Sequence, residues 1–393
     1  MKTEPEPGGS SVKNIWSLNF QDWFWQVRHR ITTLEQLEKI VNLTVEEKRA
    51  VAFSGKMFKM AITPYFASLM SKDDSNCPIR KQCIPSLQEF KTNLNELSDP
   101  CGEEETSPVA GLVHRYPDRV LLLITDACAM YCRHCTRRRI VGSSETRMSM
   151  ANFHLAVKYI KEHKEIRDVL ISGGDPLLLS DEKLDYYLKT LRSIENIEII
   201  RIGTRVPVVL PQRITEKLCL TLKKYHPLFM SIHFNHPNEI TEETRKACDM
   251  LSDSGIPLGS QSVLLKGIND KPQTMTQLMQ ELLKMRVRPY YIYQCDLAKG
   301  TSHFRTTVAT GIKIIEGLRG HTTGYAVPTY VIDAPSGGGK VPVGPEYVIS
   351  KSKSGVIIRN YERKLFVYPE NGKPFTAEEV EKASKQYSLT KKQ

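Results

Sequence analysis

The sequence predicts an α/β protein built around a partial (β/α)6 barrel, with a helical extension before it and a β extension after it. Three observations lead to this fold class. Helix-capping patterns occur in the N-terminal part, short apolar runs then alternate with amphipathic segments of helical length, and only short strands follow Gly320. Apolar runs that alternate with helices form parallel strands joined by right-handed crossovers. We therefore divide the 393 residues into a disordered N-terminus (1–13), a helical extension (14–110), the barrel (111–320) and a C-terminal β extension with a basic tail (321–393).

The N-terminal part combines a polar leader with capped helices. Residues 1–13 contain Glu, Pro, Gly and Ser without an apolar core, which predicts disorder and argues against a secretory signal. Thr33 and Thr44 are each followed by glutamates in what would be a first helical turn, so we expect a helix to begin after each of them. Trp23 and Trp25 are expected to pack in this extension.

The later elements follow from the period of the apolar residues. We expect barrel strands at 120–125, 168–172, 197–201, 228–234, 258–265 and 289–294. We expect helices between and after them at 150–163, 181–193, 212–225, 238–254, 272–285 and 306–318. The β extension is expected to hold strands at 325–334, 347–352, 356–361 and 364–368, with a hairpin turn at Ser354-Gly355. Parallel barrels carry their chemistry on the loops that follow the strands.

Composition narrows the function classes. An apolar fraction of 40% and a charged fraction of 25% are ordinary for a globular protein, and no apolar run approaches the roughly 20 residues of a membrane helix. Nine cysteines in a long chain without a secretory signal predict a reducing, cytoplasmic location. The net charge of +11 is dispersed and accompanies no recognition helix or RNA-binding signature, so we expect no nucleic-acid partner. The run Arg137-Arg138-Arg139 suits small anions such as carboxylates and phosphates.

Three cysteines in the pattern C-x-x-x-C-x-x-C follow the first barrel strand: Cys128, Cys132 and Cys135. Three thiolates can hold a four-iron cluster and leave one iron open to a substrate or cofactor, whereas electron-transfer clusters usually have a cysteine on every iron. The spacing resembles the signature of radical S-adenosylmethionine enzymes. The alternative, a zinc knuckle, needs a fourth ligand, typically from a second pair, and the other six cysteines show no such spacing.

Two glycine-containing motifs accompany the cysteines. Ser172-Gly173-Gly174-Asp175 ends the second barrel strand, where glycines let backbone approach a ligand closely; a tight turn is the alternative. In radical S-adenosylmethionine enzymes a related motif binds the methionine amino group of the cofactor. Lys340 follows the run Gly337-Gly338-Gly339 but lacks the spacing of a phosphate loop. A lysine in this position suits a Schiff base with an aldehyde cofactor such as pyridoxal phosphate.

Taken together, these motifs resemble the lysine 2,3-aminomutases over about residues 23 to 360. The matching segments are 60–65, 80–82, 114–119, 125–128, 131–139, 207–213, 233–237 and 288–291. The resemblance implies an isomerase that moves the amino group of L-lysine from carbon 2 to carbon 3, giving L-β-lysine. It implies three cofactors: a [4Fe-4S] cluster, S-adenosylmethionine, and pyridoxal 5′-phosphate, on whose aldimine a 5′-deoxyadenosyl radical acts.

The resemblance also implies roles for individual residues. Lys340 would form the Schiff base, Arg115 and Arg119 would hold the cofactor phosphate, and Tyr116 would lie near its ring. His134, His233 and Gln261 would line the S-adenosylmethionine site. The substrate would be bound by Arg137 at its carboxylate and by Asp296 and Asp333 at its distal ammonium.

Departures and alternatives remain open at this stage. Longer members of the family carry a C-terminal cysteine-rich zinc site shared between subunits. This chain has no cysteine after Tyr361, and Lys271 stands where the partner cysteine is expected, while Ser336 stands where the family usually has glycine. Glutamate-specific relatives replace both distal aspartates, so glutamate is not expected. Two alternatives remain among enzymes: the same reaction with arginine as substrate, and a lysine modification that serves a translation factor. From a different class, an iron–sulfur electron-transfer or scaffold protein also remains an alternative. Expected partners are a flavodoxin or ferredoxin as reductant and further copies of the chain.

Overall fold

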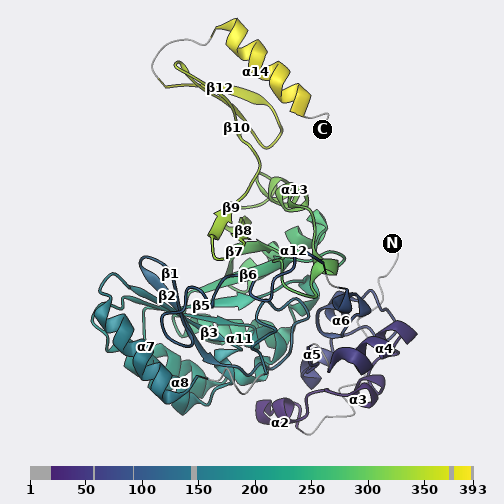
Figure 1. The fold of residues 1–393 in the computed structure, drawn as a ribbon. Helices are drawn as coiled ribbons and strands as arrows, with labels where there is room; N and C mark the ends of the chain where they lie inside the picture. The colour runs from purple at the N-terminus through teal and green to yellow at the C-terminus, as the bar shows by residue number, and fades with distance from the viewer. Residues whose placement is uncertain (1–18, 56–57, 92, 143–147, 371–375, 391–393) are drawn as a thin grey trace.

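The computed structural model describes residues 19–55, 58–91, 93–142, 148–370 and 376–390 (Figure 1). Its centre is a nine-stranded sheet in the order β1-β2-β3-β4-β5-β6-β7-β8-β9, in which β2 to β8 run parallel and the two edge strands run antiparallel. The nine strands are β1 (Leu112–Tyr116), β2 (Arg119–Thr125), β3 (Asp168–Gly173), β4 (Ile199–Thr204), β5 (Leu228–His233), β6 (Leu258–Leu264), β7 (Val287–Gln294), β8 (Thr329–Ala334) and β9 (Gly339–Pro342). The predicted open barrel of the α/β class is confirmed.

Helices connect the parallel strands and cover the outside of the sheet (Figure 1). The principal ones are α7 (Met150–Glu162), α8 (Asp181–Arg192), α10 (Glu216–Lys223), α11 (Glu242–Asp253), α12 (Pro272–Lys284) and α13 (Val308–Leu318). In α8 the buried residues Leu184, Tyr187, Leu188 and Leu191 recur at helical spacing, and Ser180 caps the first turn by accepting from the Lys183 N–H. This spacing places the apolar stripe of the helix against the sheet.

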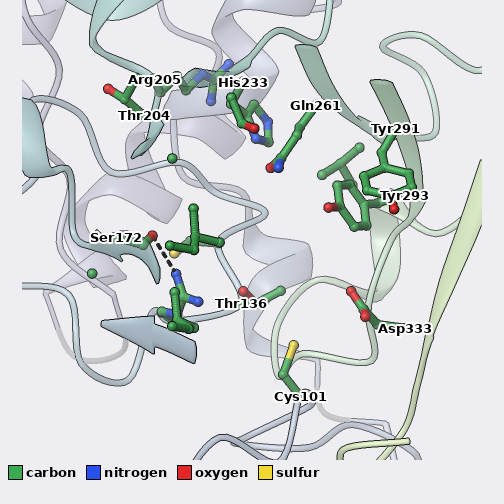
Figure 2. A pocket seen from close by; sticks show the side chains of 18 of the residues that line it. Cys101, Thr136, Ser172, Thr204, Arg205, His233, Gln261, Tyr291, Tyr293 and Asp333 are labelled. Atoms are coloured by element: carbon green, nitrogen blue, oxygen red, sulfur yellow. Dashed lines mark hydrogen bonds between the residues drawn. The ribbon is translucent and has the colours of Figure 1, made fainter. Parts of the chain in front are cut away.

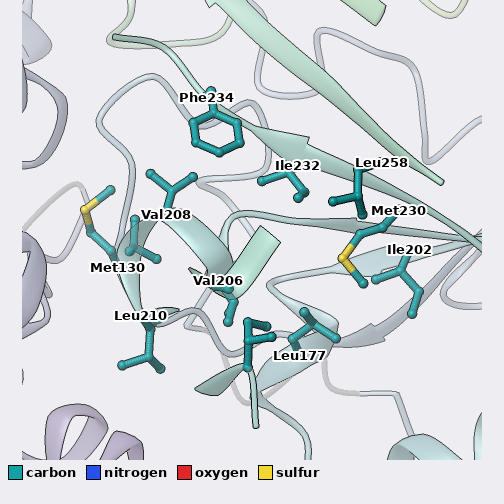
Figure 3. Packing of buried hydrophobic residues seen from close by; sticks show 14 of the residues in the cluster. Met130, Leu177, Ile202, Val206, Val208, Leu210, Met230, Ile232, Phe234 and Leu258 are labelled. Carbon is teal, nitrogen blue, oxygen red and sulfur yellow. The ribbon is translucent and has the colours of Figure 1, made fainter. Parts of the chain in front are cut away.

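The strands alternate between two environments. In β3 and β4 every second residue is fully buried, and the residues between them are half-buried. The buried set, including Val169 and Ile202, packs beneath the helices, and Figure 3 shows Ile202 near Met230 and Ile232 in this core. Because side chains alternate across a strand, the other set turns into the barrel, where Leu170 and Ser172 line a cavity. The alternation of residues along each strand therefore decides which side chains can contact a ligand inside the barrel.

The N-terminal extension is helical, as expected. Its helices are α2 (Trp23–Arg28), α3 (Leu34–Glu38), α4 (Val45–Ser54), α5 (Pro64–Ala67) and α6 (Pro78–Cys83). Thr33 and Thr44 both form capping boxes, closed by Gln36 and Glu47. The extension is tied to the barrel where the Thr63 hydroxyl donates to the Val209 carbonyl over 2.5 Å. The expected disorder of residues 1–13 lies outside the described residues.

The C-terminal part differs from the prediction in three ways. The strand expected at 325–334 in the β extension is β8, and it pairs parallel with β7 as a continuation of the barrel sheet. Lys340, expected on a flexible loop, lies in strand β9, paired with β8. The tail forms helix α14 (Ala377–Thr390), which the sequence analysis missed because its apolar residues are few.

A separate three-stranded sheet completes the chain. Its strands are β10 (Val348–Ser352), β11 (Gly355–Arg359) and β12 (Leu365–Pro369), all antiparallel. This sheet and α14 stand apart from the barrel at the C-terminal end (Figure 1). Among the described residues no helix is long and apolar enough to cross a membrane. The cytoplasmic location stays a prediction.

Candidate active site

One cavity of about 770 Å³ lies inside the barrel, toward the carboxyl ends of the parallel strands. Every residue that the sequence analysis assigned to a metal, cofactor or substrate lines it: Arg115, Tyr116, Arg119, Cys128, Cys132, His134, Cys135, Arg137, Ser172, Gly173, Gly174, Asp175, His233, Gln261, Asp296, Asp333 and Lys340. Figure 2 shows Gln261 and His233 on one wall, with Tyr293 nearby and Asp333 beside Cys101 on the other. The fold therefore gathers these residues, while their individual roles stay predictions.

The cysteine loop follows β2 and is anchored by the residue between two of its cysteines. Arg133 is 1% exposed, pairs with Glu89 over 2.5 Å and donates to the carbonyls of Phe58 and Lys59. Its side chain thus fastens the loop to the helical extension. Cys132 accepts from the Arg205 Nη1 group over 2.8 Å. This contact joins the cysteine loop to the loop after β4.

Cys128 and Cys135 are half-buried beside other thiols, which disfavours their ionisation in the absence of a metal. Burial, and then the neighbouring thiols, raises the pKa of Cys128 well above its usual value and the pKa of Cys135 to about 11. Iron must therefore displace protons when it binds here, as at other thiolate sites.

The glycine motif packs directly against the cysteine loop. Gly173 adopts φ of +127°, and a Cβ atom there would collide with the Thr125 carbonyl, while one at Gly174 would collide with the Ala127 carbonyl. Backbone hydrogen bonds join the same segments, from the Gly174 N–H to Thr125 over 2.6 Å. Only glycine permits this approach of the two backbones.

Asp175 is satisfied within the protein. Its carboxylate accepts from the Thr204 hydroxyl over 2.6 Å and from the Arg205 N–H over 2.7 Å. It therefore ties the loop after β3 to the loop after β4, a structural contact that the sequence did not indicate. A role for Asp175 toward a cofactor stays a prediction.

Two histidines share a buried contact near the cysteines. The Nε2 atoms of His134 and His233 lie 3.2 Å apart, and their rings are stacked with centroids 5.2 Å apart. Burial lowers the pKa of His134 well below its usual value and, with a contribution from Arg205, the pKa of His233 to about 3. Both rings are therefore neutral at physiological pH, and neutral imidazoles can accept as well as donate hydrogen bonds. In the described part of the chain, His134 Nδ1 is buried without a hydrogen-bond partner.

Lys340 projects from β9 into the cavity. Its Nζ atom donates to Asp333 Oδ1 over 3.1 Å and lies 5.3 Å from the centre of the Tyr293 ring. Its backbone N–H donates to the Tyr116 hydroxyl over 2.9 Å, and the Arg119 guanidinium lies 4.0 Å from the centre of the Tyr116 ring. The predicted lysine, tyrosine and arginine thus form one continuous cluster.

Two carboxylates face each other beside this lysine. One carboxylate oxygen of Asp296, one of Asp333 and the Sγ atom of Cys101 all lie within 4.8 Å of one another. Burial, and then repulsion by Asp333, raises the pKa of Asp296 to about 7, although Lys340 partly offsets both effects. A second cation placed between these carboxylates would relieve their repulsion.

Arg137 is paired inside the protein, which the sequence did not indicate. Glu103 accepts from Arg137 Nε over 2.9 Å and from Nη2 over 2.7 Å, and the Ser172 hydroxyl accepts from Nη1 over 3.2 Å (dashed in Figure 2).

The sequence analysis also missed other residues that line the cavity: Cys101, Glu103, Arg205, Tyr290, Tyr291 and Tyr293. For Tyr291 and Tyr293 a signal was present, because alternate residues near the end of a barrel strand face inward. For Glu103 no local pattern pointed to the site, since it lies in a segment without a regular element.

Comparison with known proteins identifies the chain's relatives. The model of the Radical SAM superfamily matches residues 122–279, and a model described as lysine-2,3-aminomutase matches residues 315–393. An L-lysine 2,3-aminomutase of Fusobacterium nucleatum is 55% identical over 96% of this chain and 89% of its own length. One of Clostridium subterminale is 57% identical over 91% of this chain and 86% of its own length. A glutamate 2,3-aminomutase of Clostridioides difficile is 46% identical over 90% of this chain and 84% of its own.

Proposed function

The chain belongs to the lysine 2,3-aminomutase family of the Radical SAM superfamily, and on this premise we propose that it converts L-lysine into L-β-lysine by moving the amino group from carbon 2 to carbon 3. One observation carries the proposal: a single cavity joins a three-cysteine loop, a lysine and a pair of carboxylates. An iron–sulfur scaffold would need the cysteines but would have no use for the other two groups.

The residues of the cysteine loop suit a [4Fe-4S] cluster and S-adenosylmethionine. Three thiols from one short loop match the donor chemistry of an iron–sulfur cluster with one open iron. The orphaned buried Nδ1 atom of His134 and the polar end of Gln261 offer hydrogen bonds to a bound cofactor on the adjacent wall. Together the two cofactors would supply the 5′-deoxyadenosyl radical that removes and returns hydrogen.

The residues around β9 suit pyridoxal 5′-phosphate. Arg115 Nε is buried without a hydrogen-bond partner among the described residues, and Arg119 Nη1 pairs with the exposed Asp118, so both guanidiniums have donors left for a phosphate. Lys340 is held close by through the Tyr116 hydroxyl and provides the amine that a carbonyl cofactor needs. When bound, the cofactor would spread an unpaired electron over its conjugated ring.

The substrate fits between charges of opposite sign. Asp296 and Asp333 would face the distal ammonium, while Arg137, which follows the cysteine loop and lines the same cavity, would face the carboxylate. Glutamate would bring a second carboxylate toward the two aspartates and be repelled. The protein's task is then to hold lysine by both ends and to exclude water from the reacting carbons, while the cofactors supply the chemistry.

We further infer two partners. A flavodoxin or ferredoxin would reduce the cluster, and an acidic surface on such a protein would complement the net charge of +11. Further copies of the chain would cover the C-terminal sheet, where Phe366, Val367 and Tyr368 are exposed.

The test is anaerobic turnover after reconstitution with iron, sulfide, S-adenosylmethionine and pyridoxal phosphate, with dithionite added to reduce the cluster. L-lysine, L-arginine and L-glutamate are supplied side by side, and the β-amino acids are separated and counted. We expect β-lysine as the main product. Preferred turnover of arginine would reassign the substrate, and an absence of any β-amino acid in a protein with full cofactor content would refute the reaction.

A further inference from the structure

The segment 101–103, which belongs to no helix or strand, contacts three parts of the site. The Cys101 carbonyl accepts from Arg115. A Cβ atom at Gly102 would lie 2.8 Å from the Gly337 nitrogen, so this residue lies directly against the glycine turn before Lys340. Glu103 pairs with Arg137 over 2.7 Å. Three consecutive residues therefore contact Arg115, which is proposed to bind the cofactor phosphate, the turn before Lys340, and Arg137, which is proposed to bind the substrate carboxylate.

The pairing of Glu103 decides which donors of Arg137 remain available. A guanidinium has five N–H groups, one on Nε and two on each terminal nitrogen. Glu103 takes the Nε donor and one donor of Nη2, and Ser172 takes one donor of Nη1. One N–H group is left on each terminal nitrogen. A carboxylate binds such a pair through both of its oxygens.

The ion pair is well buried, so it has a defined geometry. The side chain of Glu103 is 8% exposed and that of Arg137 is 21% exposed. Burial opposes ionisation of Glu103, but Arg137, then Arg139 and Arg115, outweigh it and hold the pKa of Glu103 below its usual value. Glu103 is therefore a carboxylate at the pH at which a lysine substrate is bound.

We propose that Glu103 is a positioning residue for substrate: it grips Arg137 along its Nε edge and thereby aims the two terminal nitrogens at the carboxylate of the amino acid. The proposal rests on the proposed function and goes beyond it by naming the group that orients Arg137. Without Glu103, the arginine keeps its charge but loses the contact that fixes its rotation.

The closeness of Gly102 to the glycine turn before Lys340 gives this positioning a second consequence. The carboxylate and the amino group of an α-amino acid are attached to the same carbon atom. Arg137 and Lys340 must therefore lie at a set separation if they are to act on both groups at once. The segment 101–103 pairs with Arg137 and lies against the turn before Lys340, so it helps to set that separation.

The test measures binding without turnover. Protein loaded with the cluster and pyridoxal phosphate, but without S-adenosylmethionine, is dialysed to equilibrium against labelled L-lysine or 1,5-diaminopentane, which is lysine without its carboxylate. Glu103→Gln is expected to weaken lysine binding about tenfold and to leave diaminopentane within about twofold, because one charged hydrogen-bond arrangement is lost. Glu104→Gln, a change at the neighbouring exposed residue, is the matched control.

A double variant separates positioning from general support. If Glu103 acts through Arg137, then Glu103→Gln combined with Arg137→Met should bind lysine no more weakly than Arg137→Met alone. Additive losses, or equal losses for both ligands, would overturn the proposal. If Glu103→Gln fails to fold, Glu103→Asp carries the same test, since it keeps the charge but shortens the reach. Turnover of lysine by the unaltered protein is scored separately, so failure of the proposed function is distinguishable.

Discussion

Asp333 and Lys340 face each other across the antiparallel pair β8–β9, and the Lys340 Nζ atom lies 3.1 Å from Asp333 Oδ1. The residue proposed to bind the distal end of the substrate is therefore also the counter-ion of the proposed nucleophilic lysine. Asp296 lies close to the same carboxylate, so three titratable groups share one small volume.

The first prediction concerns Asp296 and pH. Its pKa of about 7, raised first by burial and then by Asp333, means that the free protein binds a proton there at lower pH. A carboxylate is needed to bind the lysine ammonium, so kcat/KM for lysine should rise as the pH increases through about 7. Asp296→Asn should remove this dependence and reduce kcat/KM for lysine by about tenfold to a hundredfold. A substrate without a distal cation, such as alanine, should be unaffected.

The same pKa shift predicts a change in stability. Because folding raises this pKa, protonated Asp296 favours the fold, and that contribution is lost as the pH rises through about 7. The melting temperature of Asp296→Asn minus that of the unaltered protein should therefore be greater at pH 8 than at pH 5. Equal melting-temperature differences at both pH values would contradict the raised pKa.

The second prediction concerns the cysteine loop. Replacement of Cys128, Cys132 or Cys135 by alanine should leave the fold intact, because Arg133 still anchors the loop to Glu89. Each change should abolish reductive cleavage of S-adenosylmethionine, measured as 5′-deoxyadenosine. Cys219→Ala, in helix α10 away from the cavity, is the control and should keep both iron content and cleavage. An unchanged yield of 5′-deoxyadenosine in one of these three variants would refute the assignment of the cluster to these cysteines.

The third prediction concerns Lys340. Lys340→Ala should lose the absorption band of the pyridoxal Schiff base and all isomerisation, because the variant has no amine at this position. Borohydride followed by peptide mapping should attach pyridoxal to Lys340 in the unaltered protein. Lys351→Ala, on the exposed strand β10, is the control. Attachment to another lysine peptide would move the role elsewhere.

The fourth prediction concerns Gly102. Its φ of +61° is costly for other residues, and a Cβ atom there would press on Gly337. Gly102→Ala should destabilise the protein by roughly 1–2 kcal/mol for the backbone strain alone and weaken retention of pyridoxal phosphate on dialysis. Gly344→Ala, where a Cβ would meet nothing within 4 Å, provides the control. Normal cofactor retention in Gly102→Ala would show that the segment 101–103 does not support the turn before Lys340.

The sequence alone was sufficient for features whose signal is local. Cys128, Cys132 and Cys135 lie within eight residues, and their spacing is visible without a fold. The six predicted barrel strands overlap β2 to β7, since buried apolar residues repeat with the period of a strand. The glycines before Lys340 likewise mark a turn, and two of them, Gly337 and Gly339, have positive φ.

The tertiary structure decided what depends on distant partners. Glu103 and Arg137 are 34 positions apart, and Arg205 and Cys132 are 73 apart, so no local period reports that they meet. Strand β8 joins the barrel because β7 offers it a free edge, a property of the assembled sheet that its own residues do not encode. Burial, which raises the pKa of Asp296, likewise exists only once the chain has closed around it. Residue types and spacings thus determined the chemistry available to this protein, and long-range packing decided which groups face each other to perform it.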